Sequence, residues 1–317
     1  MDKNKIKFDI LKIDALIKKG KAYEEEDIQF EFCNEYNNNQ SERDEKVDYP
    51  KYIAKINSKF CNYVGILSNN LRKESYGYNC HENEDEYFGQ WNKDQKEGYG
   101  IYYFKDQKIE NEDSIKQIYA GEFKNNQKSG EGIYFRITRI ETEGDNFIPV
   151  DFSLAIGNFL EDFFVKGVIF SIKDEKRKIY KGKINKDGKK NDDKAEYYED
   201  DEKVFKGKFW ENDMIEGRIV LIKDSKKEKG YYFTKNEENN IEFEYNKDEK
   251  IDEQLIKQSK ELYDIFQYDK VKELFITIMN IKNQLNSKKN FDYIKNINFD
   301  MDIKQNLKEL YGKWLYC

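Results

Sequence analysis

A short pattern of tyrosine and glycine recurs along the chain and constrains the fold more than any other sequence feature. Tyr-x-Gly-x-aromatic, followed by Gly-x-Gly-Ile-Tyr, occurs at residues 87–104 and again at 119–135, where the two segments align without a gap. Alternating large and small residues are typical of a strand, and a polar turn such as that from Asn92 to Lys96 separates the two halves. Each copy is therefore predicted to be a β-hairpin.

Four weaker copies of the pattern begin at Tyr63, Ile156, Tyr180 and Phe205. A lone two-stranded hairpin is marginal in water, so these units must stack, and at least three are needed to form a continuous core. The intervals between equivalent glycines are 24, 32, 36, 25 and 25 residues, and the longer ones predict polar loop insertions at 106–116 and 139–151. The residues that define the repeats are Tyr63, Gly65, Tyr87, Gly89, Trp91, Gly98, Gly100, Tyr119, Gly121, Phe123, Gly130, Gly132, Gly157, Phe159, Tyr180, Gly182, Phe205, Gly207 and Phe209.

The glycines of the pattern have a steric explanation. Tyr87, Gly89 and Trp91 share one face of their strand, so the glycine leaves a gap into which a neighbouring ring or backbone can press. Gly98 and Gly100 are expected to repeat this arrangement on the return strand.

The pattern resembles the MORN (membrane occupation and recognition nexus) family, whose consensus is close to Y-x-G-x-W-x-x-G-x-x-x-G-x-G. The resemblance covers roughly half the chain. Asp94 and Asn126 replace the consensus glycine of the turn, and both residue types tolerate a left-handed backbone. The resemblance implies a binding scaffold, because some MORN proteins are built into axonemal structures such as the radial spoke head. MORN arrays also occur beside lipid kinases and lysine methyltransferases, but the 70 C-terminal residues are too short and too helical for either.

Composition agrees with a thin, stacked structure. Hydrophobic and charged residues each make up 38% of the chain, which disfavours a thick core, while 15% aromatic residues disfavour disorder. The predicted fold class is mainly β, an elongated antiparallel sheet of stacked hairpins. The predicted divisions are an N-terminal flank with a polar linker (1–50), the repeat array with an atypical terminal hairpin (51–247) and a C-terminal helical segment (248–317).

The two flanks differ in periodicity. Apolar residues within 5–19 favour a helix but also permit a strand, and residues 28–32 alternate as a strand does. The atypical hairpin combines 230–233 with 241–245 and would cap the sheet. Beyond residue 251, apolar residues recur at helical spacing over 251–266, 271–285 and 303–314. These helices either fold together or against the last repeat, or one of them docks on another protein.

Sites for chemistry are sparse. His81 is the single histidine, and its neighbour Cys80 would point to the opposite face of a strand. The four cysteines contain no CxxC pair, and the glycine pairs lack the following helix of a phosphate-binding loop. The sequence therefore predicts no enzyme, cofactor, metal, nucleic acid or small-molecule substrate.

One region has a local charge that differs from the acidic whole. Residues 173–194, named the basic stripe here, contain ten Lys or Arg and five acids, whereas the chain has a formal charge of -7. The stripe could bind anionic lipid headgroups or acidic protein tails, or could be an ordinary solvated hairpin. Its candidate binding residues are Lys178, Lys181, Lys183, Lys186, Lys189 and Lys190.

Two functions remain in view alongside the disfavoured enzyme. The first is a protein-binding subunit of a large cytoskeletal assembly, such as a ciliary axoneme complex of the radial-spoke type. The second is a peripheral scaffold that links membrane to cell cortex through the basic stripe. The sequence has no apolar run long enough to cross a membrane, which favours a cytoplasmic, cytoskeletal location.

Overall fold

The computed structural model describes residues 29–36, 51–57, 61–68, 72–108, 114–143, 146–200, 202–223, 226–235, 241–245 and 249–287. The chain divides into two compact units. Unit 1 comprises Met1–Lys105, Phe123–Asn126 and Lys282–Ile303, and unit 2 comprises Asp106–Glu122, Gln127–Ile281 and Lys304–Cys317. The predicted helix or strand at 5–19, most of the linker and the third C-terminal helix lie outside the described residues.

Unit 1 is built from antiparallel strands, each paired with the next along the chain. The predicted strand near residue 30 is present, as β1. The strands are β1 (Gln29–Tyr36), β2 (Lys51–Asn57), β3 (Cys61–Leu67), β4 (Lys73–His81), β5 (Glu86–Asn92) and β6 (Gln95–Tyr103).

Unit 2 is also built from antiparallel strands paired with their neighbours along the chain. Its elements are β7 (Gln107–Lys108), β8 (Ser114–Lys124, whose end belongs to unit 1), β9 (Gln127–Glu143), β10 (Asn146–Leu160), β11 (Phe163–Lys173), β12 (Lys176–Lys183), β13 (Asp192–Glu199), β14 (Lys203–Trp210), β15 (Asp213–Lys223), β16 (Lys226–Lys235), β17 (Ile241–Tyr245), α2 (Glu249–Ile265) and α3 (Tyr268–Ser287). The predicted fold class, antiparallel hairpins followed by a helical segment, is confirmed.

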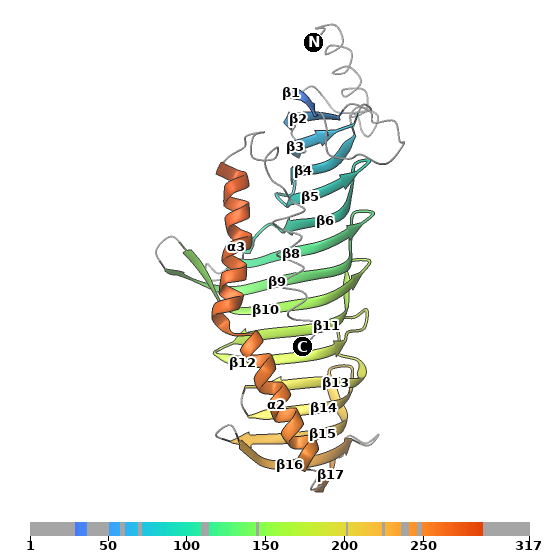
Figure 1. The fold of residues 1–317 in the computed structure, drawn as a ribbon, viewed down its shortest axis with the longest axis vertical. Helices are drawn as coiled ribbons and strands as arrows, with labels where there is room; N and C mark the ends of the chain where they lie inside the picture. The colour runs from blue at the N-terminus through green and yellow to red at the C-terminus, as the bar shows by residue number, and fades with distance from the viewer. Residues whose placement is uncertain are drawn as a thin grey trace. The chain divides into compact units, whose positions relative to one another are not determined.

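Both helices use their apolar stripes to cover one face of the strands of unit 2, named the helix face here. Figure 1 shows α2 crossing β14, β15 and β16. Phe266, at the end of α2, packs on Phe170 with ring centroids 5.1 Å apart, and Phe275 of α3 packs on Phe135 at 6.2 Å. The first two predicted stripes thus pack against the sheet. None of the described helices is long and apolar enough to cross a membrane.

A buried ion pair also fastens α2 to the helix face. Arg218 of β15 donates from Nε and Nη2 to the two carboxylate oxygens of Asp252, each at 2.8 Å. Arg218 is 7% exposed and Asp252 is fully buried. Such a forked pair fixes the orientation of the helix, because removing either partner leaves the other charge buried.

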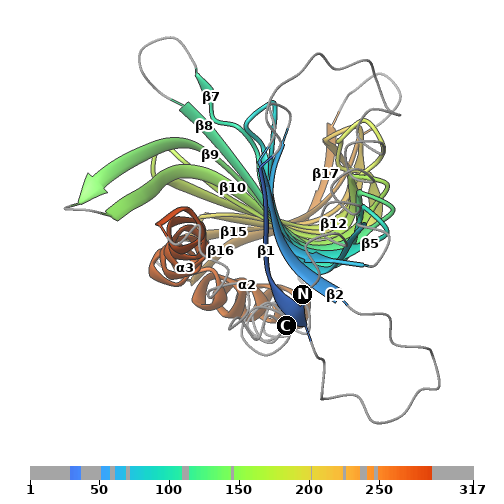
Figure 2. The same ribbon diagram turned by 90° about the horizontal axis from the view of Figure 1, so that it is seen from above.

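The predicted loop insertion at 139–151 was wrong. β9 and β10 remain paired through this region, from Phe152 opposite Ile137 to Asn146 opposite Glu143, and Figure 2 shows them running on together as an arm. The other predicted insertion, 106–116, contains β7, which pairs with the start of β8. The segment resembles a loop in sequence because its polar residues are interrupted by Gly144 and Pro149.

The atypical hairpin is present as β16 and β17, with Phe233 opposite Phe243. Its distinguishing residue is Phe233, which stands opposite Gly217 where earlier hairpins pair glycine with glycine. The Phe233 side chain is buried and packs on Phe205 at 5.6 Å. A ring at this position ends the row of glycines in unit 2.

Candidate functional site

Each complete repeat places a tyrosine ring over its own glycine. In the hairpin of β5 and β6, a Cβ added to Gly89 would lie 2.5 Å from both the Tyr87 hydroxyl and the Cα of Gly100. The Tyr87 hydroxyl donates a hydrogen bond of 2.8 Å to the carbonyl of Gln90. The gap left by glycine is therefore filled by the hairpin's own tyrosine and by the opposite glycine backbone.

The same hydroxyl bond recurs in four hairpins. The tyrosine at the start of each pattern donates to the carbonyl three residues later: Tyr63 to Ile66, Tyr87 to Gln90, Tyr119 to Glu122 and Tyr180 to Lys183, at 2.8–2.9 Å. Burial raises the pKa of Tyr63 and of Tyr180, so both hydroxyls keep their protons. In each unit, the face of the strands that carries these tyrosines is named the tyrosine face here.

Gly98 and Gly130 have a different role from the one predicted. Their φ angles are +81° and +68°, in the left-handed region that favours glycine, and their missing side chains make room for Gln90 and Glu122. Gln90 Oε1 in turn accepts the backbone N–H of Tyr99 at 2.7 Å. These two glycines therefore form a local irregularity of the strand, whereas Gly100 and Gly132 carry the rings.

Aromatic rings join neighbouring hairpins at four places on the tyrosine face. The tyrosine or phenylalanine at the start of one pattern contacts the aromatic residue that ends the first strand of the following hairpin. The pairs and their centroid distances are Tyr63–Trp91 at 5.9 Å, Tyr87–Phe123 at 5.1 Å, Tyr119–Phe159 at 5.0 Å and Tyr180–Phe209 at 5.3 Å. In the hairpin at Gly157 the ring comes instead from Phe164, on the return strand.

The turns add a second link between hairpins. Asp94 and Asn126, which replace the consensus glycine, both have φ of +71°, as the sequence predicts for a left-handed turn. Asn126 Oδ1 accepts the backbone N–H of Lys96 at 2.8 Å, while the Asn126 N–H donates to the Lys96 carbonyl at 3.0 Å. Asp94 makes the same two bonds to Lys73. This pair of bonds is named the turn clamp here.

The turn clamp recurs in unit 2. Asp162 is bonded in this way to Lys128, and Asn212 to Lys190, with distances of 2.8–3.1 Å. A side-chain oxygen is required for half of the clamp, so the departure from glycine creates a contact that glycine cannot make.

The clamped lysines also cover the rings of the tyrosine face. The ammonium group of Lys73 lies 4.6 Å from the Trp91 ring, and that of Lys96 lies 4.5 Å from the Tyr102 ring. Lys128 lies over Tyr119 and Tyr134, and Lys190 over Tyr180, Tyr197 and Phe209. Burial lowers the pKa of Lys128 and Lys190, and each cation is held over electron-rich ring faces.

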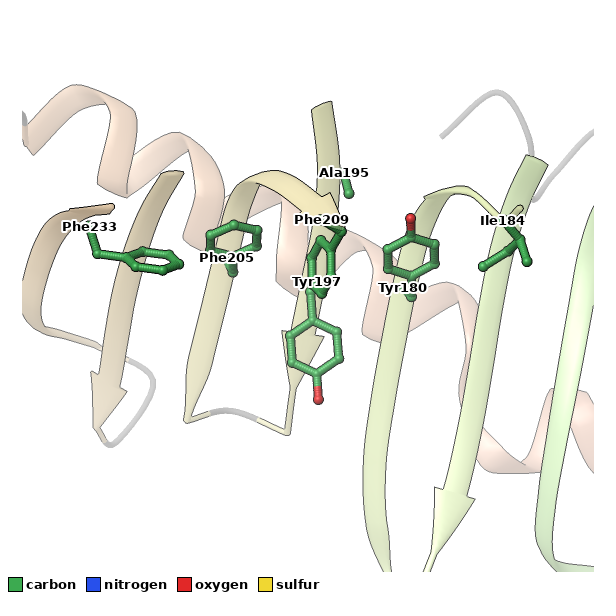
Figure 3. Close-up of a cluster of buried hydrophobic side chains, with 7 residues drawn as sticks. All are labelled: Tyr180, Ile184, Ala195, Tyr197, Phe205, Phe209 and Phe233. Carbon is green, nitrogen blue, oxygen red and sulfur yellow. The ribbon is translucent and has the colours of Figure 1, made fainter. Parts of the chain in front are cut away.

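A cluster of buried hydrophobic side chains in unit 2 lies under Lys190. Figure 3 shows its members, which come from β12 and the residue after it, β13, β14 and β16; they are Tyr180, Ile184, Ala195, Tyr197, Phe205, Phe209 and Phe233. At its border, Glu199 lies 2.8 Å from Lys203 and 3.0 Å from Lys178. These hydrogen bonds, led by that from Lys203, lower the pKa of Glu199 to about 2. The border is therefore a network in which two lysines share one carboxylate.

The basic stripe does not form one cationic surface. Lys178 lies on the tyrosine face with Glu199, whereas Lys181 lies on the helix face, 3.9 Å from Glu196. Lys189 pairs with Glu211, and Lys190 is half-buried over the rings. Lys183 and Lys186 are exposed near the turn after β12. The six candidate residues are thus distributed over two faces and a turn. Three of them are paired with carboxylates, two on the adjacent strand β13 and one in the turn after β14.

The helix face of unit 2 has an open groove of about 500 Å³ beside the start of α2. Lys206, Lys208 and Glu216 contribute charged groups, while Tyr232, Ile251 and Leu255 contribute apolar surface. Lys206 lies 3.2 Å from Glu196 and Lys208 lies 3.6 Å from Asp193. A groove of mixed character suits a peptide or a protein side chain better than a single anion.

His81 has surroundings that suit a structural residue. Burial, followed by the charges of Lys96 and Lys73, lowers its pKa to about 4, so the imidazole is neutral near pH 7. Its ring lies 6.2 Å from Tyr102. Within the described ranges, no group of three or more His, Cys, Asp or Glu side chains is placed to hold a metal ion.

Several residues of the tyrosine face were missed from the sequence. Gly77, Gly167 and Gly217 stand opposite Gly65, Gly157 and Gly207. They could have been found by searching the return strand of each hairpin for a second glycine, across the turn from the first one. The covering lysines had no comparable signal, because their contacts come from neighbouring hairpins.

Comparison with known families agrees with this geometry. The MORN repeat model matches residues 87–108 and 119–136, two hairpins that carry the tyrosine, both glycines and the ring contact. A search of curated proteins returned no significant match for the chain. The MORN repeat is a non-enzymatic repeat family, and its arrays are consistent with a scaffold role in binding proteins or membranes. The chain is a MORN-repeat protein.

Proposed function

We propose that the chain is a protein-binding scaffold, a subunit of a large cytoskeletal assembly in the cytoplasm. The observation that carries the proposal is the set of apolar side chains exposed on unit 2. Leu160 and Phe163, on either side of one turn, are 57% and 51% exposed, and Trp210, beside another turn, is 55% exposed. Exposed aromatic and aliphatic groups are typical of protein interfaces.

The lipid alternative receives less support. A membrane surface attracts clustered cations whose charge is not neutralised by neighbours. In the basic stripe Lys178, Lys181 and Lys189 face carboxylates, and Lys190 is withdrawn over aromatic rings. The family resemblance adds the more specific proposal of a ciliary axoneme complex of the radial-spoke type, which rests on analogy.

Affinity purification from the cells that make the protein tests the scaffold proposal. The full chain and a Leu160→Ser/Phe163→Ser/Trp210→Ser variant serve as baits, followed by fractionation of cytoskeleton and membrane. We expect the full chain to recover a defined set of proteins from the cytoskeletal fraction, and the variant to lose most of them. Equal recovery by both baits, or recovery of membrane alone, would contradict the proposal.

Co-sedimentation with phosphatidylserine vesicles tests the lipid alternative. The test variant is Lys181→Glu/Lys183→Glu/Lys186→Glu, and the matched control reverses three exposed lysines outside the stripe, Lys93, Lys124 and Lys229. Binding that is lost in the test variant and kept in the control would establish a lipid function in place of the protein scaffold.

A further inference from the structure

β17 is the edge strand at which the aromatic row of unit 2 ends. Among the strands that the structure describes, its partner is β16, with Phe243 opposite Phe233 and Glu242 opposite Thr234. A strand that is paired on one side directs every second N–H and C=O outward, where another chain can bond to them.

The side chains of β17 on the tyrosine face are apolar and exposed. Phe243 is 63% exposed and Ile241 is 52% exposed. Phe243 contacts Tyr231 at 5.9 Å and Phe233 at 6.4 Å, both on the preceding strand. The aromatic residues Trp91, Phe123 and Phe209 of earlier hairpins are at most 5% exposed because rings on both sides cover them. One further strand carrying an apolar residue opposite Phe243 would complete the same environment.

The opposite side of β17 is acidic. Glu242 and Glu244 alternate with the apolar residues and are both exposed. They lie on the same face as Tyr232, whose hydroxyl donates to Glu216 at 2.5 Å on the next strand inward. A strand added here would meet carboxylates on one face and apolar groups on the other.

A second copy of the chain does not fit this edge. When two copies of β17 pair antiparallel over three or more residues with their apolar faces together, a glutamate meets a glutamate in every register. If the pairing is centred on Phe243, Glu242 of one copy stands opposite Glu244 of the other. If it is centred on Glu242 or Glu244, that glutamate stands opposite the same glutamate of the other copy. Like charges directly opposite one another destabilise a strand pair.

We propose that β17 binds an extended segment of a partner protein in which lysine or arginine alternates with aliphatic or aromatic residues. The basic side chains pair with Glu242 and Glu244, and the apolar side chains pack on Ile241 and Phe243. Backbone bonds supply affinity and the alternating side chains supply specificity. The inference rests on the scaffold function proposed above and gives one of its partners a chemical character.

The test uses the full chain and fluorescent peptides of the sequence Thr-Lys-Val-Lys-Phe-Lys-Thr, with glutamate in place of lysine in a matched acidic peptide. We expect the basic peptide to bind at least about tenfold more tightly by fluorescence anisotropy, the effect of two opposed charge pairs. A basic peptide that is N-methylated at alternate residues should bind at least about tenfold more weakly, because it cannot complete the backbone bonds.

Variants of the chain locate the binding. Glu242→Lys/Glu244→Lys should reverse the preference between the peptides, while Glu141→Lys/Glu175→Lys, which changes net charge equally at exposed sites, should leave it unchanged. Phe243→Ser should weaken the binding of both peptides to the chain. If the double β17 variant fails to fold, Phe243→Ser and the N-methylated peptide still decide the question.

Several results would overturn the proposal. They are absence of binding, equal binding of the N-methylated peptide, or the same preference in the β17 variant and its control. The two glutamates would then only prevent edge-to-edge pairing. Failure of the peptides while affinity purification still recovers protein partners removes the assignment of β17 alone, whereas failure of the purification removes the scaffold function itself.

Discussion

Gly132→Ala tests whether the tyrosine ring is the reason for the second glycine of the repeat. A Cβ at this position would lie 2.5 Å from Cε2 and from the hydroxyl oxygen of Tyr119, closer than any ordinary contact. Tyr119 is fully buried, so its ring has nowhere to move without breaking contacts.

The magnitude follows from what the ring would lose. Displacement breaks the hydroxyl bond to Glu122, about 1 kcal/mol, and disturbs the contact with Phe159 at 5.0 Å, about 0.5–1.5 kcal/mol. Strain from overpacking brings the expected loss in the free energy of unfolding to about 2–4 kcal/mol.

Gly188→Ala is the matched control. Gly188 belongs to the same unit and has φ of +77°, but a Cβ there would meet nothing within 4 Å. The substitution therefore costs only the left-handed backbone strain, about 1 kcal/mol.

Guanidinium unfolding of the full chain, followed by circular dichroism, measures both variants. A second comparison repeats Gly132→Ala in a Tyr119→Ala background, where the space is open and the added cost should fall below about 1 kcal/mol. The explanation fails if Gly132→Ala costs no more than Gly188→Ala, or if its cost persists without the tyrosine.

Four further predictions concern the turns, two titrating groups and the buried ion pair. Asn126→Gly should lower the free energy of unfolding by about 1 kcal/mol or less, because glycine keeps the left-handed turn and only the side-chain bond to Lys96 is lost. Asn126→Ala should cost about 1 kcal/mol more in thermal unfolding, because alanine also strains the turn. Equal costs would refute the turn clamp. His81 has a folded pKa of about 4, below its unfolded value of 6.5, so its contribution to stability is present above pH 6.5 and is lost as pH falls toward 4. NMR titration of the single imidazole should give a midpoint near pH 4. A midpoint near 6.5 would contradict the burial of this side chain. Glu199, with a folded pKa of about 2 against 4.5, keeps its contribution above pH 4.5 and loses it as pH falls toward 2, a dependence that should be absent from the acid unfolding of Glu199→Gln. Asp252→Ala should destabilise by about 3–5 kcal/mol and make α2 sensitive to limited proteolysis, and a loss under 1 kcal/mol would show that Arg218 is not held by this pair.

The fold was predictable where a pattern is local. The Tyr-x-Gly-x-aromatic spacing identified the hairpins, and the apolar stripes identified the regions of α2 and α3, because both signals depend on residues close in sequence. The arm formed by β9 and β10 was missed, since Pro149 and the acidic residues around it are typical of loops.

The candidate site was less predictable, because its contacts join different strands. Counting lysines along 173–194 could not reveal that Glu196, Glu199 and Glu211, which come later in the chain, would pair with three of them. The hydroxyl bond of Tyr87 and the lysine above its ring likewise depend on backbone geometry that the sequence pattern does not contain.

The turn clamp has a consequence for how such a chain can lengthen or shorten over evolution. Asp94 meets Lys73 with the same two bonds with which Asn126 meets Lys96, so the two junctions are chemically interchangeable. A gene that duplicated or deleted one whole hairpin would bring together a turn and a lysine that already match. Loss of one or two residues inside a hairpin would instead leave a turn without its lysine, which favours change in whole units.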